Sequence, residues 1–303
     1  MTGVEPNEPK AHHYAPQFYL RNFAHDSARK KIWAVAKHGD RAIWQERSIE
    51  YLGVQEDLYT VTVAGVPVSV ERTIGHEIES PISQSEAWEK ISSNRAVALT
   101  VADKAIIYAL LRHFEARTPH MRQTLSELID ICEISPEKFS AEEREMYCAL
   151  RQDHELRSMV QAYQASSLAW TNQNFERAAI SICRTQIPLR TSTTPVLTIE
   201  APDHPALHLP LPNQKPYTLT MTLNRFAFAT LTLGDFGADA FTNDMVSDDV
   251  ANGYNRHRVA QFAHFDSNAH LIGDRNSLIE DMTWALYEVE LERADKITFR
   301  RAS

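Results

Sequence analysis

Two histidines open the part of this sequence that is richest in residues able to do chemistry. The stretch HHYAPQFYLRNF, residues 12–23, combines them with aromatic residues, a proline and an arginine. Imidazole groups act near neutral pH as general acids, bases or metal ligands. On an extended segment His12 and His13 face opposite sides, so at most one of them faces a given pocket. The proline favours a short helix on which Gln17 and Arg21 share a face. We therefore expect a polar cluster on an aromatic base, with a structural role for the histidines as the open alternative.

Arg117 is the most informative residue outside this segment. It falls on an apolar helical stripe, three residues after Phe114 and four before Met121, where leucine is expected. A buried guanidinium is costly unless it meets a carboxylate or an anionic ligand. Two interpretations stay open: a clamp for a phosphate group, or an internal ion pair with Glu79 or another acid.

Glu79 and a hydroxyl-rich run supply the other candidates. Pro81 restricts the backbone near Glu79, and His76 lies one turn earlier, although a solvated helix surface is the alternative. The hydroxyls of residues 191–194 can hold an anion, or they can belong to an ordinary turn. We take Ser192 as a substrate-binding residue and not as a nucleophile, because the G-x-S-x-G motif is absent.

Histidine, carboxylate and arginine together suit hydrolysis of a phosphate-containing substrate, as in a nuclease-like phosphodiesterase. In this hypothesis the catalytic residues are His13, as base or metal ligand, and Glu79, as ligand or second base. A divalent metal ion, Mg²⁺ or Mn²⁺, would be held by His12, His13 and Glu79. The substrate-binding side chains would be Gln17, Arg21, Arg117 and Ser192. The rival hypothesis is a non-catalytic binding or regulatory module in which the opening segment is structural.

The opening segment resembles the signature H-H-Y-x-P-Q-F-Y-L-x-x-F of the DUF4238 family of bacterial domains of unknown function. Further likenesses extend along most of the chain: EDLYTV at 56–61, HEIE at 76–79, RHFEARTPHMR at 112–122, RTSTTPVL at 190–197 and the pair Pro210-Leu211. Thr193 departs from the family pattern, which usually has aspartate there. If that carboxylate is a ligand or base in relatives, its role is altered or lost here. The resemblance implies no particular reaction.

The charge is uneven along the chain. The formal net charge is -9, but residues 10–47 hold eight Lys and Arg against three Asp and Glu, a balance of about +5. The acidic total argues against a protein that coats nucleic acid with its whole surface. The local excess favours a phosphate-containing ligand or nucleic acid as partner, although solvated surface charge also explains it. No apolar run reaches the roughly 20 residues that span a bilayer, so we expect no membrane partner. An oligomeric partner is not indicated.

Cysteine usage bears on the cellular compartment. The three cysteines, Cys132, Cys148 and Cys183, are far apart and odd in number. This pattern predicts buried free thiols in a reducing environment instead of a disulfide framework or a zinc site. Together with the polar N-terminal segment, it favours a cytoplasmic location.

The expected elements alternate between strands and helices. Alternating residues predict hairpins around Gly39-Asp40 and Ala64-Gly65. Helical periodicity follows at 74–93 and again from Thr100, with Asp103 as capping partner and an interruption at Pro119. Later elements are helices from Ser140 and over 154–183, strands at 194–200, 206–212 and 217–233, and helices over 243–265 and 275–293, with NRHR at 255–258 as polar surface.

This order of elements predicts an α+β fold: short, largely antiparallel strands with a predominantly helical middle and C-terminal helices. We expect one large domain over residues 1–303. Its parts are the N-terminal motif and strands (about 12–72), a helical region (about 74–184), a second strand group (about 187–233) and C-terminal helices (about 243–293).

Overall fold

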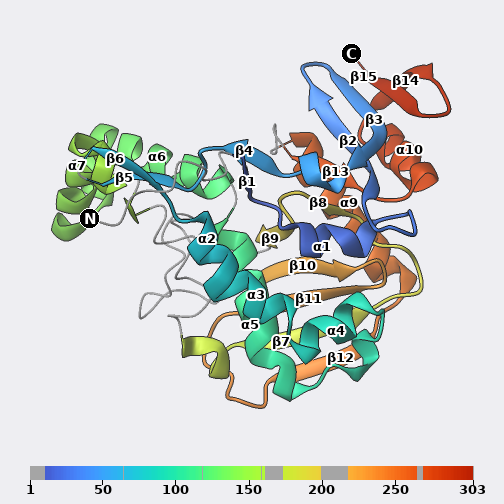
Figure 1. Ribbon diagram of the computed structural model, residues 1–303, viewed down its shortest axis with the longest axis horizontal. Coiled ribbons are helices and arrows are strands. Elements are labelled where there is room, and N and C mark those ends of the chain that lie inside the picture. Colours follow the sequence, from blue (N-terminus) through green and yellow to red (C-terminus); the bar gives the residue numbers. More distant parts are fainter. Residues whose placement is uncertain are drawn as a thin grey trace.

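Helices and mostly antiparallel sheets make up the chain, which confirms the predicted α+β class (Figure 1). The computed structural model describes residues 11–63, 65–117, 119–157, 159–160, 173–198, 218–264 and 269–302. Two larger sheets, of six and five strands, carry most of the described strands. None of the helices in these ranges is both long and apolar enough to cross a membrane.

The six-stranded sheet has the order β14-β15-β3-β2-β13-β8. Its strands are β2 (Lys31–His38), β3 (Arg41–Ser48), β8 (Thr191–Ser192), β13 (His270–Ile272), β14 (Tyr287–Glu292) and β15 (Lys296–Arg301). The first predicted hairpin is confirmed, because β2 and β3 pair antiparallel with His38 opposite Arg41. Gly39 makes the tight turn with a φ of 64°, a conformation that glycine adopts without a steric penalty.

The five-stranded sheet has the order β12-β7-β11-β10-β9. Its strands are β7 (Ala179–Arg184), β9 (Val196–Thr198), β10 (Thr218–Asn224), β11 (Ala227–Thr232) and β12 (Phe241–Met245). Strands β10 and β11 form an antiparallel hairpin and confirm the strand prediction at 217–233. Among the described strand pairs of this sheet, only β12 and β7 are parallel. The strand expected at 206–212 and the pair Pro210-Leu211 lie outside the described residues.

Strand β7 corrects the helix predicted over 154–183, whose final residues are extended. Ile180 and Ile182 are buried while the intervening Ser181 is half-exposed, which is the two-residue period of a strand. Neighbours β11 and β12 hydrogen-bond this segment on both sides. The gain from a central position in the sheet therefore outweighs a helix-compatible local composition.

The helical middle follows the predicted boundaries closely. Its main helices are α4 (Glu86–Ser92), α5 (Lys104–Ala116), α6 (Pro119–Ile134) and α7 (Ala141–Gln152). The Asp103 carboxylate accepts a hydrogen bond from the Thr100 N–H at 2.8 Å, which completes the expected capping box. Pro119 begins α6, where its missing N–H sacrifices no helical hydrogen bond. A second capping box, between Ser140 and Glu143, begins α7.

The helical region before α4 contains an irregular turn. It consists of α2 (Glu71–Ile74), the π-helix η3 (Gly75–Glu79) and α3 (Ser80–Ser83). The prediction of helix from residue 74 is thus confirmed. A π-helical turn is rare and is found frequently at functional sites, and this one carries the candidate carboxylate of Glu79.

The C-terminal region departs from the prediction of two long helices. Helix α9 (Asp248–His264) is present, but α10 (Arg275–Trp284) ends early, and β14, which forms a hairpin with β15, lies where helix was expected. Ile297 and Phe299 of β15 are buried, and β15 pairs with β3. Burial of these alternating apolar side chains against helices α9 and α10 explains β15, and β14 pairs with β15 at the edge of the sheet.

The opening segment is packed into the body of the protein. Strand β1 (Ala11–His13) pairs with β4 (Val54–Glu56), and α1 (Gln17–Leu20) continues into the 3-10 turn η1 (Arg21–Phe23). The Tyr19 side chain is fully buried, with its ring centroid 4.8 Å from that of Phe114 on α5. The aromatic residues therefore anchor the segment as expected.

The remaining short elements are η2 (Ile49–Tyr51), β5 (Thr60–Val63), β6 (Val66–Ser69), η4 (Ala96–Ala98), η5 (Val101–Asp103), η6 (Pro136–Lys138) and η7 (Gln173–Glu176).

Separate apolar clusters stabilise the different parts of the fold. The largest one joins α4 and α5 to the five-stranded sheet and includes the aromatic residues of the opening segment. A second one lies between the six-stranded sheet and helices α9 and α10. A third one is made by α6 and α7 with Phe139 of the connecting segment. The opening segment thus belongs to the main core, which positions its polar side chains.

Gly53 permits the close approach that holds the opening segment. Its carbonyl accepts a hydrogen bond from the Tyr14 N–H at 2.7 Å, its φ is 63°, and an added Cβ would collide with Ala15. We expect Gly53→Ala to lower the free energy of unfolding by about 1–3 kcal/mol in urea denaturation. Gly65→Ala is the control, because Gly65 has a φ of 79° but open space around it. Equal costs for the two variants would contradict the close-approach argument.

Candidate functional site

Arg117 lies at the C-terminal end of α5 and is only 1% exposed. Its Nη2 lies 2.8 Å and 3.0 Å from the two carboxylate oxygens of Glu71, and its Nη1 forms an ion pair with Glu79. Its Nε donates to the Tyr59 hydroxyl at 3.1 Å, and its Cζ lies 4.7 Å from the centre of that ring. Of the two open interpretations, the internal ion pair is therefore the observed one, with a second carboxylate added. We call the set His12, Tyr59, Glu71, Glu79, His113 and Arg117 the Arg117 cluster.

His113 brings an unusual imidazole to this cluster. It is fully buried on α5, and its Nε2 lies 3.3 Å from Oε1 of Glu79. Burial lowers the pKa of His113 to about 3, and the nearby negative charge of Glu71 opposes that shift only in part. His113 is therefore neutral at pH 7. Its Nδ1 has no hydrogen-bond partner among the described residues.

His12, and not His13, is the histidine that faces the Arg117 cluster. Its Nδ1 accepts a hydrogen bond from the Tyr59 N–H at 2.8 Å, and its Nε2 lies 3.2 Å from the hydroxyl of Ser69. The His12 and Tyr59 rings are stacked with centroids 5.7 Å apart. Both ring nitrogens are thus engaged, and the Tyr59 hydroxyl in turn donates to the Arg117 carbonyl at 2.7 Å. These contacts attach the opening segment to the C-terminal end of α5.

His13, Gln17 and Arg21 form a second, separate group. The Nε2 of His13 lies 3.1 Å from the Glu50 carbonyl and 3.2 Å from the Gln17 amide nitrogen. Arg21 donates to the Gln17 side-chain carbonyl at 3.4 Å, which places both residues on one helix face as expected. The opening segment therefore directs its two histidines into different surroundings, as the alternation of an extended strand requires.

Arg21 lines a pocket of about 480 Å³ between the opening segment and helices α3 and α4. Its lining includes Arg29, the aromatic side chains of Phe18 and Trp88, and the acid Glu89. The Arg29 guanidinium donates to the Arg21 carbonyl at 3.1 Å, and neither arginine forms an ion pair within the described ranges. We call this hollow the Arg21 pocket. Sequence reasoning missed Arg29 as a site residue, although the local basic excess pointed to its segment.

Ser192 lies apart from both groups, in β8 of the six-stranded sheet. Its hydroxyl donates to the Thr194 carbonyl at 2.8 Å and accepts from the Thr194 N–H at 3.2 Å. Thr193, which replaces the aspartate of the family pattern, accepts a hydrogen bond from the His270 N–H at 3.0 Å. The hydroxyl of Thr191 lies 2.5 Å from that of Tyr19. The hydroxyl-rich run is thus a buried, hydrogen-bonded turn that contacts the opening segment.

The expectation of a polar surface at residues 255–258 is wrong for two of the four. Asn255 and Arg258 are buried, because α9 presents them to the two sheets. Arg258 donates to the Tyr254 hydroxyl at 2.8 Å and to the Thr220 carbonyl at 3.2 Å, and it also contacts the Pro195 carbonyl. Hydroxyl and carbonyl oxygens thus solvate this guanidinium in place of water.

The described residues do not form a group that could bind a metal ion. Within them, no three His, Cys, Asp or Glu side chains are arranged so that they could hold a metal ion. The proposed ligands are split, since His12 and Glu79 belong to the Arg117 cluster and His13 lies with Gln17. The Mg²⁺ or Mn²⁺ site predicted from the sequence therefore gains no support from the geometry.

The fold and these contacts define the chain as an α+β protein in which His12, Arg117 and Ser192 are buried, whereas the other candidate residues are partly or fully exposed. Residues 11–225 match the family described as "Protein of unknown function (DUF4238)", and the chain belongs to this family. No curated protein and no solved structure matches it. The matched range covers the opening segment and each member of the Arg117 cluster, whereas α9, α10 and the last strands lie beyond it.

Proposed function

We propose that this protein binds a phosphate-containing small molecule in the Arg21 pocket, and that the Arg117 cluster is structural. One observation carries the proposal: two arginines without an ion-pair partner in the described ranges line one hollow, whereas Arg117 is already neutralised by two carboxylates. A guanidinium presents several N–H donors in a planar fork that matches phosphate oxygens. Arg21 and Arg29 can therefore hold an anion that Arg117 cannot.

Charge and shape in the Arg21 pocket support an anionic ligand with an organic part. Glu89 is the acid of the lining, and it is paired with Arg95 at 2.6 Å. The positive charges of Arg21 and Arg29 thus prevail at the rim. Phe18 and Trp88 pack edge to face at 4.8 Å and provide an apolar wall. A phosphate ester with an aromatic or aliphatic group fits these surroundings better than inorganic phosphate alone.

The double variant Arg21→Ala/Arg29→Ala tests this proposal. Inorganic phosphate, pyrophosphate and adenosine monophosphate are titrated against the full chain by calorimetry and by thermal unfolding. We expect binding to the native chain and a loss of affinity of roughly tenfold to hundredfold per arginine, because a hydrogen bond to a charged group contributes about 1.5–3 kcal/mol. The melting temperature without ligand should change little, since both side chains are exposed.

Arg41→Ala is the matched control, because Arg41 is an exposed arginine on β3 that pairs with Glu290 at a different surface. It should bind all three probes as the native chain does. Absence of binding to the native chain at about 10 mM probe, or equal binding by the double variant, would overturn the proposal.

Hydrolysis of a phosphate-containing substrate is the second candidate function. It is favoured by the π-helical turn that places Glu79 beside the neutral His113, with Glu71 and Glu79 each about one-fifth exposed (19% and 20%). A carboxylate with access to solvent next to a neutral imidazole can act as an acid–base pair. The assay uses single-stranded and duplex DNA and RNA with Mg²⁺, Mn²⁺ or chelator. Cleavage that Glu79→Gln abolishes would support this function, and no cleavage under any condition would remove it.

A further inference from the structure

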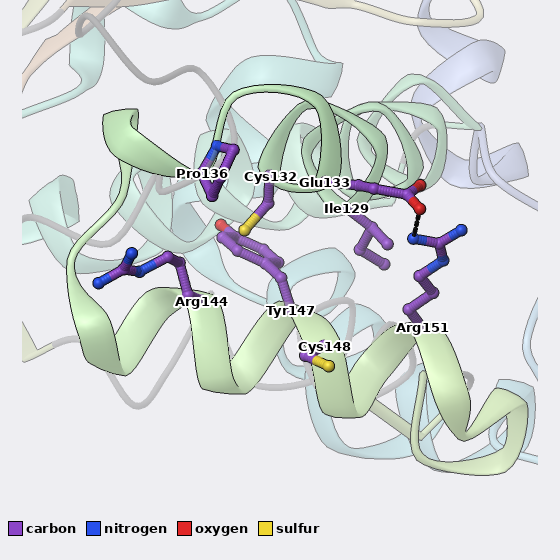
Figure 2. Close-up of a pocket in the computed structure, with 8 residues that line it drawn as sticks. All are labelled: Ile129, Cys132, Glu133, Pro136, Arg144, Tyr147, Cys148 and Arg151. Atoms are coloured by element: carbon purple, nitrogen blue, oxygen red, sulfur yellow. Dashed lines mark ion pairs between the residues drawn. The ribbon is translucent and has the colours of Figure 1, made fainter.

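A groove between α6 and α7 is separate from both groups described above. It encloses about 220 Å³ and belongs to the third apolar cluster of the fold (Figure 2). Its floor consists of Ile129 and Cys132 from α6 and Tyr147 from α7, all buried. An apolar cavity of about 150 Å³ is sufficient for a benzene molecule. The groove therefore has room for an apolar group of this size or slightly larger.

The two ends of the groove differ in charge. At one end Arg151 forms an ion pair with Glu133, drawn as a dashed line in Figure 2, so this end is neutral. At the other end lies Arg144, which forms no ion pair in the part of the chain that the structure describes. Glu143, the residue before Arg144, is engaged in the capping box, where it accepts a hydrogen bond from the Ser140 N–H at 2.7 Å. One cation without a partner thus stands beside an apolar floor.

We propose that this groove binds a small apolar carboxylate, with the hydrocarbon part on Ile129, Cys132 and Tyr147 and the carboxylate on the guanidinium of Arg144. A single guanidinium neutralises one negative charge and pairs with both oxygens of a carboxylate. Burial of the hydrocarbon part supplies the remaining affinity at about 25 cal/mol per Å² of apolar surface. The site is independent of the Arg21 pocket, so its test does not depend on the proposed function.

Two thiols at the groove make occupancy measurable. Cys132 and Cys148 both line it, whereas Cys183 lies in β7 of the five-stranded sheet. Cys148 is exposed, and burial raises the pKa of the Cys132 thiol. A bound ligand should therefore cover Cys148 and slow its alkylation. It should also slow the alkylation of the buried Cys132, while Cys183 serves as an internal reference.

The experiment measures alkylation rates of the full chain by peptide-resolved mass spectrometry in the presence of hexanoate, benzoate or hexanol. We expect saturating hexanoate or benzoate to slow labelling of Cys148 at least fivefold with the rate at Cys183 unchanged. Hexanol should protect at least tenfold less effectively at equal concentration, because it lacks the charge. Arg144→Gln should raise the hexanoate concentration needed to protect Cys148 at least tenfold, as expected for the loss of a hydrogen bond to a charged group.

Arg144 is exposed, so Arg144→Gln is expected to fold normally, and Arg41→Gln on β3 is its matched control. The control should leave protection by hexanoate unchanged. No protection by either acid at about 10 mM would overturn the proposal. Equal protection by hexanol and hexanoate, or protection that survives Arg144→Gln, would overturn it as well, because the carboxylate would then have no role.

Discussion

Replacing Arg117 with methionine is expected to lower the free energy of unfolding by about 3–5 kcal/mol in urea denaturation. The substitution removes the positive charge that neutralises Glu71 and Glu79, and both carboxylates then face a buried methionine side chain in place of their cation. It also removes the donor to the Tyr59 hydroxyl. The loss is large because only about one-fifth of each carboxylate side chain is exposed (19% and 20%), so water solvates the remaining negative charges only in part after the cation is gone.

The triple variant Arg117→Met/Glu71→Gln/Glu79→Gln is the control for this effect. With the carboxylates made neutral, no unpaired charge remains, and we expect the triple variant to be more stable than Arg117→Met alone. If Arg117→Met instead keeps the native stability, the structural role of the Arg117 cluster is wrong. Loss of nucleic acid cleavage at full stability would then favour the hydrolase.

Acidification is expected to destabilise the chain between about pH 6.5 and pH 4.5. Burial lowers the pKa of His113 to about 3 and that of His270 to about 4, whereas in the unfolded chain both titrate near 6.5. Below pH 6.5 the unfolded state therefore binds protons that the folded state does not bind, so the free energy of unfolding decreases as the pH is lowered. The contribution of each histidine is fully present above pH 6.5 and disappears as the pH falls to the lowered pKa. At about 1.4 kcal/mol per pH unit, each histidine accounts for roughly 3 kcal/mol by pH 4.5.

His113→Gln separates this contribution from other acid effects. Glutamine can donate to Glu79 but does not titrate, so the decrease in stability from pH 6.5 to pH 4.5 should be smaller by roughly 2–3 kcal/mol than in the native chain. His257→Gln is the matched control, because His257 is an exposed histidine on α9. Identical pH profiles for His113→Gln and the native chain would show that His113 does not drive the effect.

Local patterns predicted much of the fold. The hairpin of β2 and β3, the capping box at Thr100, the helix that begins after Ser140 and the helix interruption at Pro119 all depend on residues close together in the sequence. The errors have a different origin. Residues 179–183 and 287–292 were expected to be helical and instead join sheets: β7 pairs with β11 from a distant part of the chain, and β14 pairs with β15, which is itself held by the distant strand β3. Their pairing partners decide these segments, and a local window does not contain them.

The candidate site residues likewise divide into those that local sequence patterns identified and those that only the packing revealed. Arg117 was recognised as a buried cation in need of an acid, and Glu79 was among the acids considered. Glu71, its second partner, carried no pattern that distinguished it from a surface carboxylate. The sequence also did not identify Arg29 as a neighbour of Arg21, because their proximity depends on a turn in which Arg29 itself has a φ of 53°.

By itself, the sequence determined the α+β class, the aromatic anchoring of the opening segment, and the rule that its two histidines face opposite sides. Those properties follow from side-chain chemistry and from the periods of helix and strand. Only the tertiary structure decided that His12 faces Arg117 and that Ser192 belongs to a buried turn. It also decided that Arg117 is neutralised, whereas Arg21 and Arg29 have no ion-pair partner among the residues that the structure describes. Whether a charge can serve a ligand depends on which other charges lie within a few ångströms of it, and that is set by packing between segments far apart in the chain.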